Sequence, residues 1–428
     1  MVNHARSVVL LSAALAAATA VVVAASRATH AGLTVHEWGT FTSVAGPNGQ
    51  SVNWTPLSGP QDLPCFVDHQ TLDQQGLTSV QVKGRDIFGL LKLLNGSAPP
   101  AAVVAAPVPR PAASVVPPAI MTAKVRMETP VLYFYAPEPV SVSVNVSFKQ
   151  GVMSEWYPKA TVPPVKLMQP LAGTVGNIEW QAVRVLPGAK LLYPQDGIKS
   201  HYYAAREVDA SPLQVGGQYE KFLFYRGLAD FQPPLTATIG THDDVTVTAS
   251  LPGSHLVLFE NRSGRVGYRT ARLTRSATTL SQPTLTGSVD ALRADLEAML
   301  TAEGLYPREA KAMVETWRDS WFEEGARIFY IIPKSAVDER LPLTISPAPA
   351  DVARVFVGRL ELITREMKDD VERAIAANDL DALNRYGRFL DSIALQIADR
   401  PSISRNPTRV ATALRAVAVS RPPAAACQ

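Results

Sequence analysis

The sequence contains few cysteines and none of the common catalytic motifs. Its 428 residues include two cysteines, Cys65 and Cys427, too few for the disulfide framework of a small secreted scaffold. A bridge between them would tie down the C-terminus, but we expect instead a buried Cys65 and a free thiol at Cys427. Gly-x-Ser-x-Gly, His-Glu-x-x-His, Cys-x-x-Cys and Gly-x-x-x-x-Gly-Lys are all absent. These absences disfavour the common hydrolase, zinc-protease, redox and nucleotide mechanisms, but not a site assembled from distant strands.

The sequence also lacks a strong excess of charge of either sign. The formal net charge is +3, but residues 1–31 contribute two arginines and residues 400–428 contribute five, with no acid in either segment. Residues 32–399 therefore carry a net charge of −4 and are mildly acidic. This distribution is not that of a nucleic-acid-binding protein.

Long apolar runs are confined to the N-terminus. Residues 1–31 have the pattern of a secretory signal peptide, with Arg6, an apolar run over 7–26 and small residues before a cleavage point near Ala31 or Ser26. The alternative is a retained membrane anchor, because the run is nearly long enough to span a bilayer. No later segment has this length and apolarity. We therefore expect an exported protein, periplasmic or extracellular.

Strand patterns dominate the chain from residue 32 to residue 280. Residues 32–96 contain a first strand, "VHEWGTFTSV", an Asn48-Gly49 hairpin with "SVNW" as the return strand, and a short helix over 85–96. Residues 97–120 are rich in Ala and Pro, which predicts a disordered linker or insertion. Residues 121–280 alternate short apolar strands with turns, as in "VSVSVNVSF". This pattern predicts a mainly β fold, a sandwich with jelly-roll or immunoglobulin-like packing.

Helical patterns appear after residue 280. Ser288 is a candidate N-cap for "VDALRADLEAMLTAEG", and Pro307 suits the first position of the next helix. Two strands, "ARIFYIIP" and "ARVFVGRLELI", follow, and then helices near 365–377 and 379–398. Residues 281–399 are therefore predicted to be an α+β portion. Residues 400–428 are basic and rich in Ala and Pro, and we expect a disordered tail.

Five motifs resemble those of a group of uncharacterised secreted bacterial proteins. They are "HEWGTFTSV" (36–44), "RMETPVLYFY" (126–135), "SEWYP" (154–158), "EKFLFYRGL" (220–228) and "WRDSWFEEGARIFYIIP" (317–333). The resemblance covers most of the chain after the leader. It implies export and a shared architecture, and it implies no particular activity.

His36 and Glu37 form the first candidate site. Neighbouring side chains on a regular strand point to opposite faces, so these two cannot be side-by-side ligands unless a bulge turns one of them. His36 instead shares its face with Trp38, an arrangement that suits a polar ligand, especially a sugar, or a metal. The structural alternative is a buried, hydrogen-bonded histidine that positions the first strand.

Two further candidate sites contain histidine. "HYYAARE" is read as a strand, and a groove lined by His201, Tyr203 and Arg206 could bind an anion or a glycan. The alternative is an edge strand with amphipathic aromatic residues. The turn "THDDV" contains His242, Asp243 and Asp244, which could hold a metal, although turns are ordinarily rich in Asp. Asp68-His69 is a similar, equally weak pair.

Three carboxylates lie within otherwise apolar β-segments: Glu128, Glu155 and Glu220. Two such groups brought together could do acid/base chemistry with raised pKa values. Arg126 and Arg226 offer the alternative of salt bridges between strands, and Arg226 is also a candidate ligand-binding residue.

These observations support three functional hypotheses. The first is non-catalytic binding of an extracellular polymer, such as a glycan, or of a partner protein or envelope component. The second is a hydrolase, possibly metal-dependent, built around His36, His201 and either Glu128 or Glu220. The third is a structural envelope protein whose basic tail contacts anionic surfaces. No cofactor is strongly implied, and the oligomeric state is left open.

Overall fold

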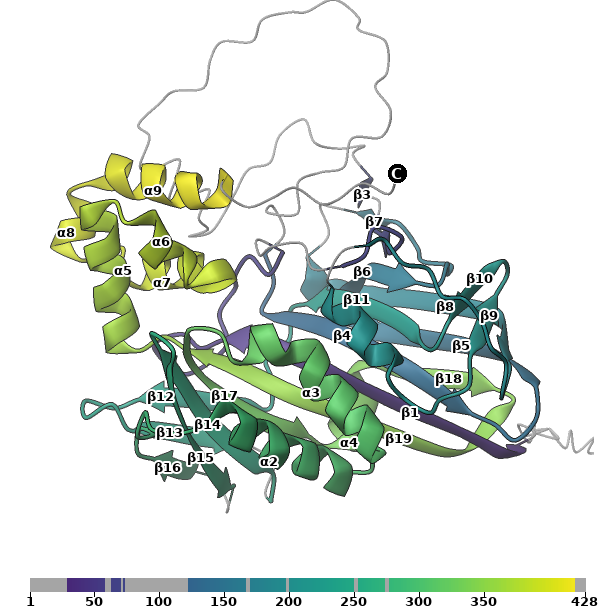
Figure 1. The fold of residues 1–428 in the computed structure, drawn as a ribbon. Coiled ribbons are helices and arrows are strands. Elements are labelled where there is room, and N and C mark those ends of the chain that lie inside the picture. The colour runs from purple at the N-terminus through teal and green to yellow at the C-terminus, as the bar shows by residue number, and fades with distance from the viewer. Residues whose placement is uncertain are drawn as a thin grey trace, which may run out of the picture.

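The computed structural model describes residues 29–57, 63–70, 72–73, 122–166, 170–197, 200–249, 253–273 and 277–419. Within these residues the fold is mainly β, and most of the helices follow the strands in sequence, as predicted (Figure 1). The predicted leader, the predicted helix over 85–96 and the Ala/Pro-rich segment 97–120 lie outside the described residues, apart from the end of the leader. None of the helices in the described part of the chain is both long and apolar enough to cross a membrane.

One large mixed sheet forms the centre of the molecule. In spatial order its longest path runs through β10 (Gln218–Glu220), β9 (Leu213–Val215), β8 (Val175–Val185), β6 (Gly151–Tyr157), β11 (Leu223–Ala229), β4 (Val125–Tyr135), β1 (Thr29–Val44), β19 (Ala348–Leu362), β17 (Gly325–Ile332), β14 (His255–Arg262) and β15 (Arg265–Arg272). The path draws on strands from the whole described chain. The boundary predicted near residue 280 therefore does not separate two sheets.

The N-terminal strand β1 lies in the middle of this sheet. It pairs antiparallel with β4, where His36 faces Tyr133, and parallel with β19, where His36 faces Ala353. A strand that is paired on both edges and covered on both faces is buried along almost its whole length. This explains why β1 is buried from Val35 to Val44.

A second layer of strands covers one face of the sheet. Within the described residues β6 and β8 pair only at Gly151 and Val175, after which β8 runs beside β5 (Val140–Lys149). Phe148 of β5 contacts Phe41 of β1, with ring centroids 6.3 Å apart. Two strand layers thus enclose one apolar core, in keeping with sandwich-like packing, while the choice between jelly-roll and immunoglobulin-like packing stays a prediction. The same layer contains β18 (Leu343–Ser346), which pairs with β5, and the small sheet β12 (Leu235–Ile239), β13 (Val245–Ala249) and β16 (Ala277–Leu280).

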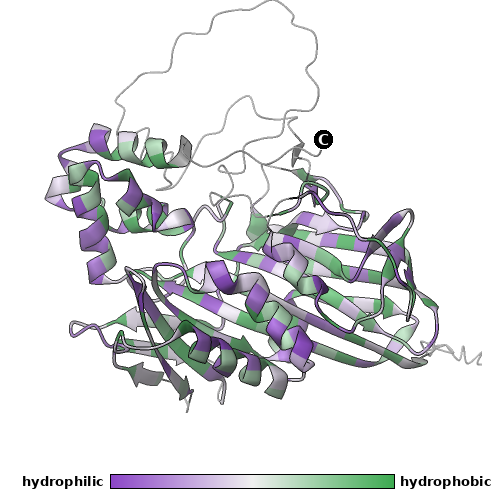
Figure 2. Ribbon diagram, in the orientation of Figure 1, coloured by the Kyte–Doolittle hydropathy of each residue, from purple (hydrophilic) through white to green (hydrophobic). Residues whose placement is uncertain are grey.

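Strand β5 shows how the sequence pattern selects this packing. Its valines and Phe148 are buried or partly buried, while the serines between them are mostly exposed. Figure 2 shows the corresponding alternation of hydrophobic and hydrophilic residues along the strands. The period-2 pattern of "VSVSVNVSF" therefore predicts the buried face correctly.

Helices cover the opposite face of the sheet. In Figure 1 α2 (Val289–Ala302) and α3 (Pro307–Trp321) lie in front of the strands, and they share a second apolar core with Trp38, Tyr133 and Phe329. Ser288 caps α2 by accepting a hydrogen bond from the backbone of Ala291, and Pro307 begins α3, as predicted. The 3-10 helix η3 (His201–Arg206) packs beside α3, and α4 (Lys334–Arg340) follows β17.

The C-terminal helices form a third core, and the prediction of a disordered tail is wrong as far as Val419. Ile403, Val410 and Leu414 are buried against the preceding helices, because the small and branched residues of this segment form an apolar helix face. Figure 1 shows these helices beside the sheet. They are α5 (Arg365–Ala377), α6 (Leu380–Asn384), η4 (Gly387–Phe389), α7 (Leu390–Gln396), α8 (Pro401–Ser404) and α9 (Pro407–Val419).

Three other local predictions need correction. Residues 201–206 are the 3-10 helix η3 rather than a strand. The turn at Gly49 forms, but "SVNW" makes isolated bridges, at Ser51 and Trp54, rather than a return strand. Cys65 is disulfide-bonded, so it is not a thiol; the other cysteine of the sequence, Cys427, lies outside the described residues. The remaining short elements are β2 (Asp68–His69), β3 (Leu72–Asp73), β7 (Val165–Lys166) and η2 (Leu171–Gly173).

We expect Gly358→Ala to destabilise the protein strongly. A Cβ at Gly358 of β19 would lie 2.0 Å from the ring of Tyr330, which is buried in the core. Overpacking of this kind costs about 1–3 kcal/mol or more. The measurement is the free energy of unfolding in urea. Gly173→Ala is the control, because a Cβ there has no heavy atom within 4 Å apart from the adjacent backbone. An equal loss of unfolding free energy in the two variants would contradict the packing argument.

Candidate functional site

His36 is buried and linked to helix α3. Its Nδ1 lies 2.7 Å from Oε2 of Glu309, and both side chains are almost fully buried. Glu309 also accepts hydrogen bonds from the hydroxyl of Tyr135 and from the backbone N–H of Tyr306, each at 2.7 Å. His36 thus helps to join the central strand to the first turn of α3, in agreement with the structural alternative for this residue.

Glu37 faces the opposite side, as the strand period predicts. Its carboxylate lies 2.5 Å from Nε of Arg354 on β19 and accepts a hydrogen bond from the hydroxyl of Tyr225. These groups are buried in the core between the two strand layers. Burial, together with the charge of Glu37, raises the pKa of Tyr225, so this hydroxyl stays protonated and donates.

The structure corrects the expectation that Trp38 forms an aromatic wall beside His36. The side chain of Trp38 does point to the same face as His36, but it is 0% exposed and packs against Tyr133 in the core beneath α2 and α3. A ligand could not reach this ring without displacing a helix.

The predicted hydrolase residues do not share a site. His36 contacts Glu309 near the start of α3, whereas His201 contacts Asp319 near its end. Ten residues of helix separate these two acids, or about 15 Å along the axis. Glu128 lies opposite Thr40, four residues from His36 and about 13 Å along the strand. Within the described residues no group of three His, Cys, Asp or Glu side chains is placed to hold a metal ion.

The turn that contains His242, Asp243 and Asp244 connects β12 with β13. Its backbone is closed by hydrogen bonds from Gly240 N–H to the carbonyl of Asp244 and from Asp243 N–H to the carbonyl of Gly240, and Asp243 adopts a left-handed φ of 61°. These are the ordinary roles of Asp in a tight turn.

The structure does bring together the predicted residues Tyr203, Arg206 and Glu220. Arg206 donates to Glu220 through Nε (2.9 Å) and Nη2 (2.6 Å), and Glu220 is fully buried. The guanidinium also lies 4.8 Å from the ring centroid of Tyr203 and 5.3 Å from that of Tyr193. We call this set the Arg206 aromatic cluster; it comprises Phe66, Tyr193, Tyr202, Tyr203, Arg206 and Glu220.

The outer part of the Arg206 aromatic cluster faces solvent. Phe66, Tyr193 and Tyr203 are half-buried, and the neighbouring Leu192 is 93% exposed. Tyr203 donates a hydrogen bond to Asp196 at 2.7 Å. Partial burial and this bond raise the pKa of Tyr203 to about 12, so its hydroxyl is protonated at neutral pH.

Arg206 holds these rings in a fixed arrangement. Burial alone would lower the pKa of the guanidinium, but the hydrogen bonds and charge of Glu220 outweigh this effect and raise it. A charged guanidinium over an aromatic face is attracted by the ring quadrupole. The pair of Arg206 and Glu220 therefore gives the surface tyrosines a preformed geometry.

A second polar cluster lies on the same face of the sheet, farther along the strands. It comprises Thr40, Arg126, Glu128, Thr129, Glu155, Arg226 and Arg388, and we call it the bulge-row cluster. Register shifts occur at one level in three adjacent pairs of strands: between Trp38 and Thr40 in β1–β4, and at Arg226 in both β4–β11 and β6–β11. Bulges of this kind redirect side chains and are common beside functional sites.

Thr129 marks the same level of the sheet. It is buried and has a φ of 44°, which is a rare conformation for a β-branched residue. Its hydroxyl accepts a hydrogen bond from Nε of Arg226 at 3.2 Å. Strain of this type costs about 1–3 kcal/mol and clusters at functional sites.

The charges of the bulge-row cluster are interlinked. Glu128 accepts from Thr42 at 3.0 Å and from Arg388 of η4. Burial alone would raise the pKa of the Glu128 carboxyl, but the guanidinium groups of Arg388 and Arg126 outweigh burial and lower it. Glu128 is therefore ionised at neutral pH, which is the reverse of what a general acid requires.

Sequence reasoning missed several members of these clusters. Phe66 and Tyr193 lie outside regular strands, and Arg388 lies in a C-terminal 3-10 helix. One signal was available: Thr129 precedes a proline within an apolar strand, a position that often departs from regular geometry.

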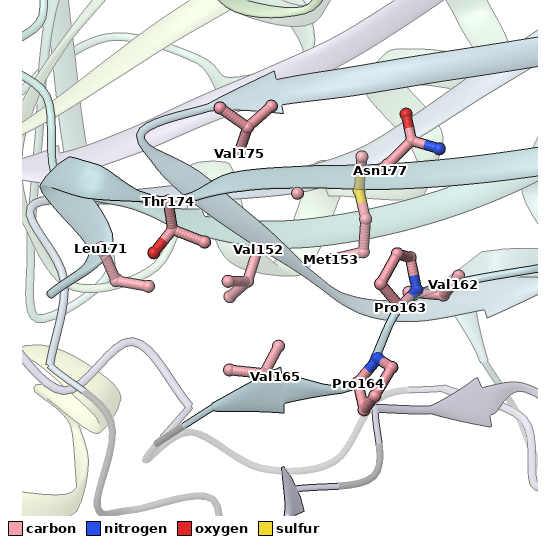
Figure 3. A pocket seen from close by; sticks show the side chains of 11 residues that line it. Val152, Met153, Val162, Pro163, Pro164, Val165, Leu171, Thr174, Val175 and Asn177 are labelled. Atoms are coloured by element: carbon pink, nitrogen blue, oxygen red, sulfur yellow. The ribbon is translucent and has the colours of Figure 1, made fainter. Parts of the chain in front are cut away.

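A pocket of about 220 Å³ opens where β6 and β8 separate. Figure 3 shows that its labelled side chains are mostly apolar, with Thr174 and Asn177 as the polar ones. The described residues that line it include none of the predicted site residues.

Comparison with known proteins adds no assignment. The chain matches no model of a protein family, and a search of curated proteins finds no significant match. The functional argument therefore rests on the geometry of the two clusters.

We expect His36→Ala to be strongly destabilising, because it leaves the buried carboxylate of Glu309 without its imidazole partner. Leaving a buried polar group without its hydrogen-bond partner costs about 1–3 kcal/mol, which unfolding in urea would measure. The matched change His201→Ala removes a partly exposed pair with Asp319 and should cost less than about 1 kcal/mol. Equal losses for the two variants would refute the assignment of His36 as a structural link.

Proposed function

We propose that this chain is an exported protein that binds an extracellular glycan, without chemistry, at the Arg206 aromatic cluster. The observation that carries the proposal is the set of tyrosine and phenylalanine rings gathered around one buried guanidinium, with Tyr193, Tyr203 and Phe66 reaching the surface. Aromatic rings that combine apolar faces with polar edges suit the faces and hydroxyls of sugars.

The polar groups beside the rings suit a ligand rich in hydroxyls. Asp196 accepts from Tyr203 and from the backbone N–H of Cys65, and His201 pairs with Asp319. These groups can exchange hydrogen bonds with sugar hydroxyls.

Preorganisation supports binding at this surface. Tyrosine offers a large contact area with few rotatable bonds, so fixing it costs little conformational entropy. Arg206, held by two hydrogen bonds from its guanidinium to Glu220, fixes the rings before any ligand arrives. Rigid binding groups gain affinity by lowering the entropy cost of binding.

The hydrolase alternative has weaker support. His36, Glu128 and Glu220 each have a separate ion-pair partner, namely Glu309, Arg388 and Arg206. A retaining or inverting glycosidase needs two carboxyl groups on either side of one bond. Export is supported by the leader pattern of residues 1–31, and membership of the resembling secreted group stays part of this proposal.

We expect Tyr203→Ala to weaken glycan binding by roughly tenfold, because it removes one stacking surface and one hydroxyl donor. Binding of the mature chain to an array of bacterial and plant cell-wall glycans would be measured first. Titration calorimetry on the best ligand would then give the dissociation constants.

Tyr268→Ala is the matched control. Tyr268 is also half-buried and donates to a carboxylate, Asp295, at 2.9 Å, but its strand β15 lies six strands from β11, roughly 29 Å away. Binding to no glycan, or equal losses in the two variants, would contradict the proposed function.

A further inference from the structure

The two clusters form one continuous strip on the same face of the sheet. Tyr157 of β6 contacts Phe66, with ring centroids 4.8 Å apart, and Glu155 lies two residues earlier on the same strand, about 7 Å away. On β11 the ring of Phe224 contacts Tyr202 (5.3 Å) on one side and the guanidinium of Arg226 (5.6 Å) on the other. The two clusters therefore adjoin through Tyr157 and Phe224, both of which are buried.

The bulge-row cluster has the chemistry of an oxyanion site. The guanidinium of Arg126 donates a hydrogen bond to the carbonyl of Pro56. It lies 3.6 Å from Glu128 and 3.8 Å from Glu155, both longer than a hydrogen bond. Arg226 and Arg388 lie close enough to act on its charge. Guanidinium forks match the geometry of carboxylate, sulfate and phosphate groups.

Two further observations indicate that a ligand belongs in this cluster. The hydroxyl of Thr40 is fully buried, lies opposite Glu128 in the sheet, and has no hydrogen-bond partner within the described residues. Burial and the neighbouring charge of Arg226 lower the pKa of Arg126 despite the opposing effect of Glu155. A bound anion would offset both the desolvation and the repulsion between arginines.

The cluster reaches the surface at its β6 side. The side chains of Arg126 and Glu155 are 10% and 9% exposed, so an entering group meets them first. His69 of β2, which is exposed, lies opposite Glu155 in the β2–β6 pair. The accessible edge of the bulge-row cluster therefore adjoins the end of β2, three residues from Phe66.

We propose that the glycan is acidic and that the bulge-row cluster binds its oxyanion while the Arg206 aromatic cluster binds a neighbouring sugar ring. This inference rests on the proposed function, and it adds the class of ligand. The oxyanion is a carboxylate, sulfate or phosphate group that takes hydrogen bonds from Arg126 and from Thr40. The row of bulges places these side chains on one face of the sheet.

The test compares acidic glycans with matched neutral forms. Calorimetry would measure binding of the best array ligand and its carboxyl-reduced, desulfated or dephosphorylated form, which separates the three sources of the oxyanion. Arg126→Gln should weaken binding of the acidic form by about 30-fold or more and leave binding of the neutral form unchanged. Arg126→Lys keeps the positive charge but loses the two parallel N–H donors of the guanidinium. Its affinity for the acidic form should therefore lie between those of the wild type and Arg126→Gln. Arg184→Gln, an exposed arginine on β8, should change neither.

A second measurement separates the two proposals. In buffers of equal ionic strength, sulfate, phosphate or acetate should raise the thermal midpoint of the wild-type chain more than that of Arg126→Gln, because the general stabilisation by salt is common to both. Circular dichroism would check that each variant is folded. If an ion has this effect but no glycan binds, the oxyanion site stands and the proposed function fails. If glycans bind but Arg126→Gln does not weaken acidic ligands selectively, the inference is overturned and the proposed function stands.

Discussion

The central strand β1 is the element on which the rest of the structure depends. It is hydrogen-bonded along both edges and covered on both faces, so each of its polar side chains needs a buried partner. His36 meets Glu309 of α3 on one face, and Glu37 meets Arg354 of β19 on the other. These two contacts connect the N-terminal strand to residues about 270 and 320 positions later in the chain. The helix layer and the second strand layer therefore both contact the same short segment of β1. This segment links the two apolar cores.

The local break in the sheet explains how a buried face can also carry charged side chains. In β4 a regular register would continue the apolar pattern of Val131 along the helix-covered face, and the bulge interrupts it. Beyond the bulge β4 presents Glu128 and Arg126 on this face, beside Thr40 of β1. The strain at Thr129 is opposed by the packing around it, because a conformation costing about 1–3 kcal/mol persists only where its surroundings determine it. The Arg206 aromatic cluster begins on the other side of the break, so one irregularity separates a stacking surface from a charged one.

Much of the architecture followed from short-range patterns in the sequence. Period-2 alternation separated His36 from Glu37, and Ser288 and Pro307 marked the starts of α2 and α3. The same reasoning failed at residues 201–206, because a run of tyrosine and alanine suits a strand as well as a 3-10 helix packed on α3. It also failed at α9, whose alanines and valines become a helix face only where a core is present to cover them. Of the candidate site residues, Tyr203 and Arg206 were predicted to lie together on a strand, whereas the structure places them on a 3-10 helix and adds Glu220, which the sequence had assigned to a different candidate group.

Local sequence patterns specify the β-rich composition, the faces of β1, the helix starts and the types of side chain available for a site. Those properties depend on residues a few positions apart, and local sterics and periodicity decide them. Which charges pair, which rings are exposed and where the sheet breaks depend instead on the three-dimensional arrangement of the elements. Glu309 and Arg388 reach His36 and Glu128 from helices more than 250 residues away, and no local pattern specifies such partners. The physical reason is that the free energy of a buried charge depends on its neighbours in space, which chain topology supplies and sequence spacing does not.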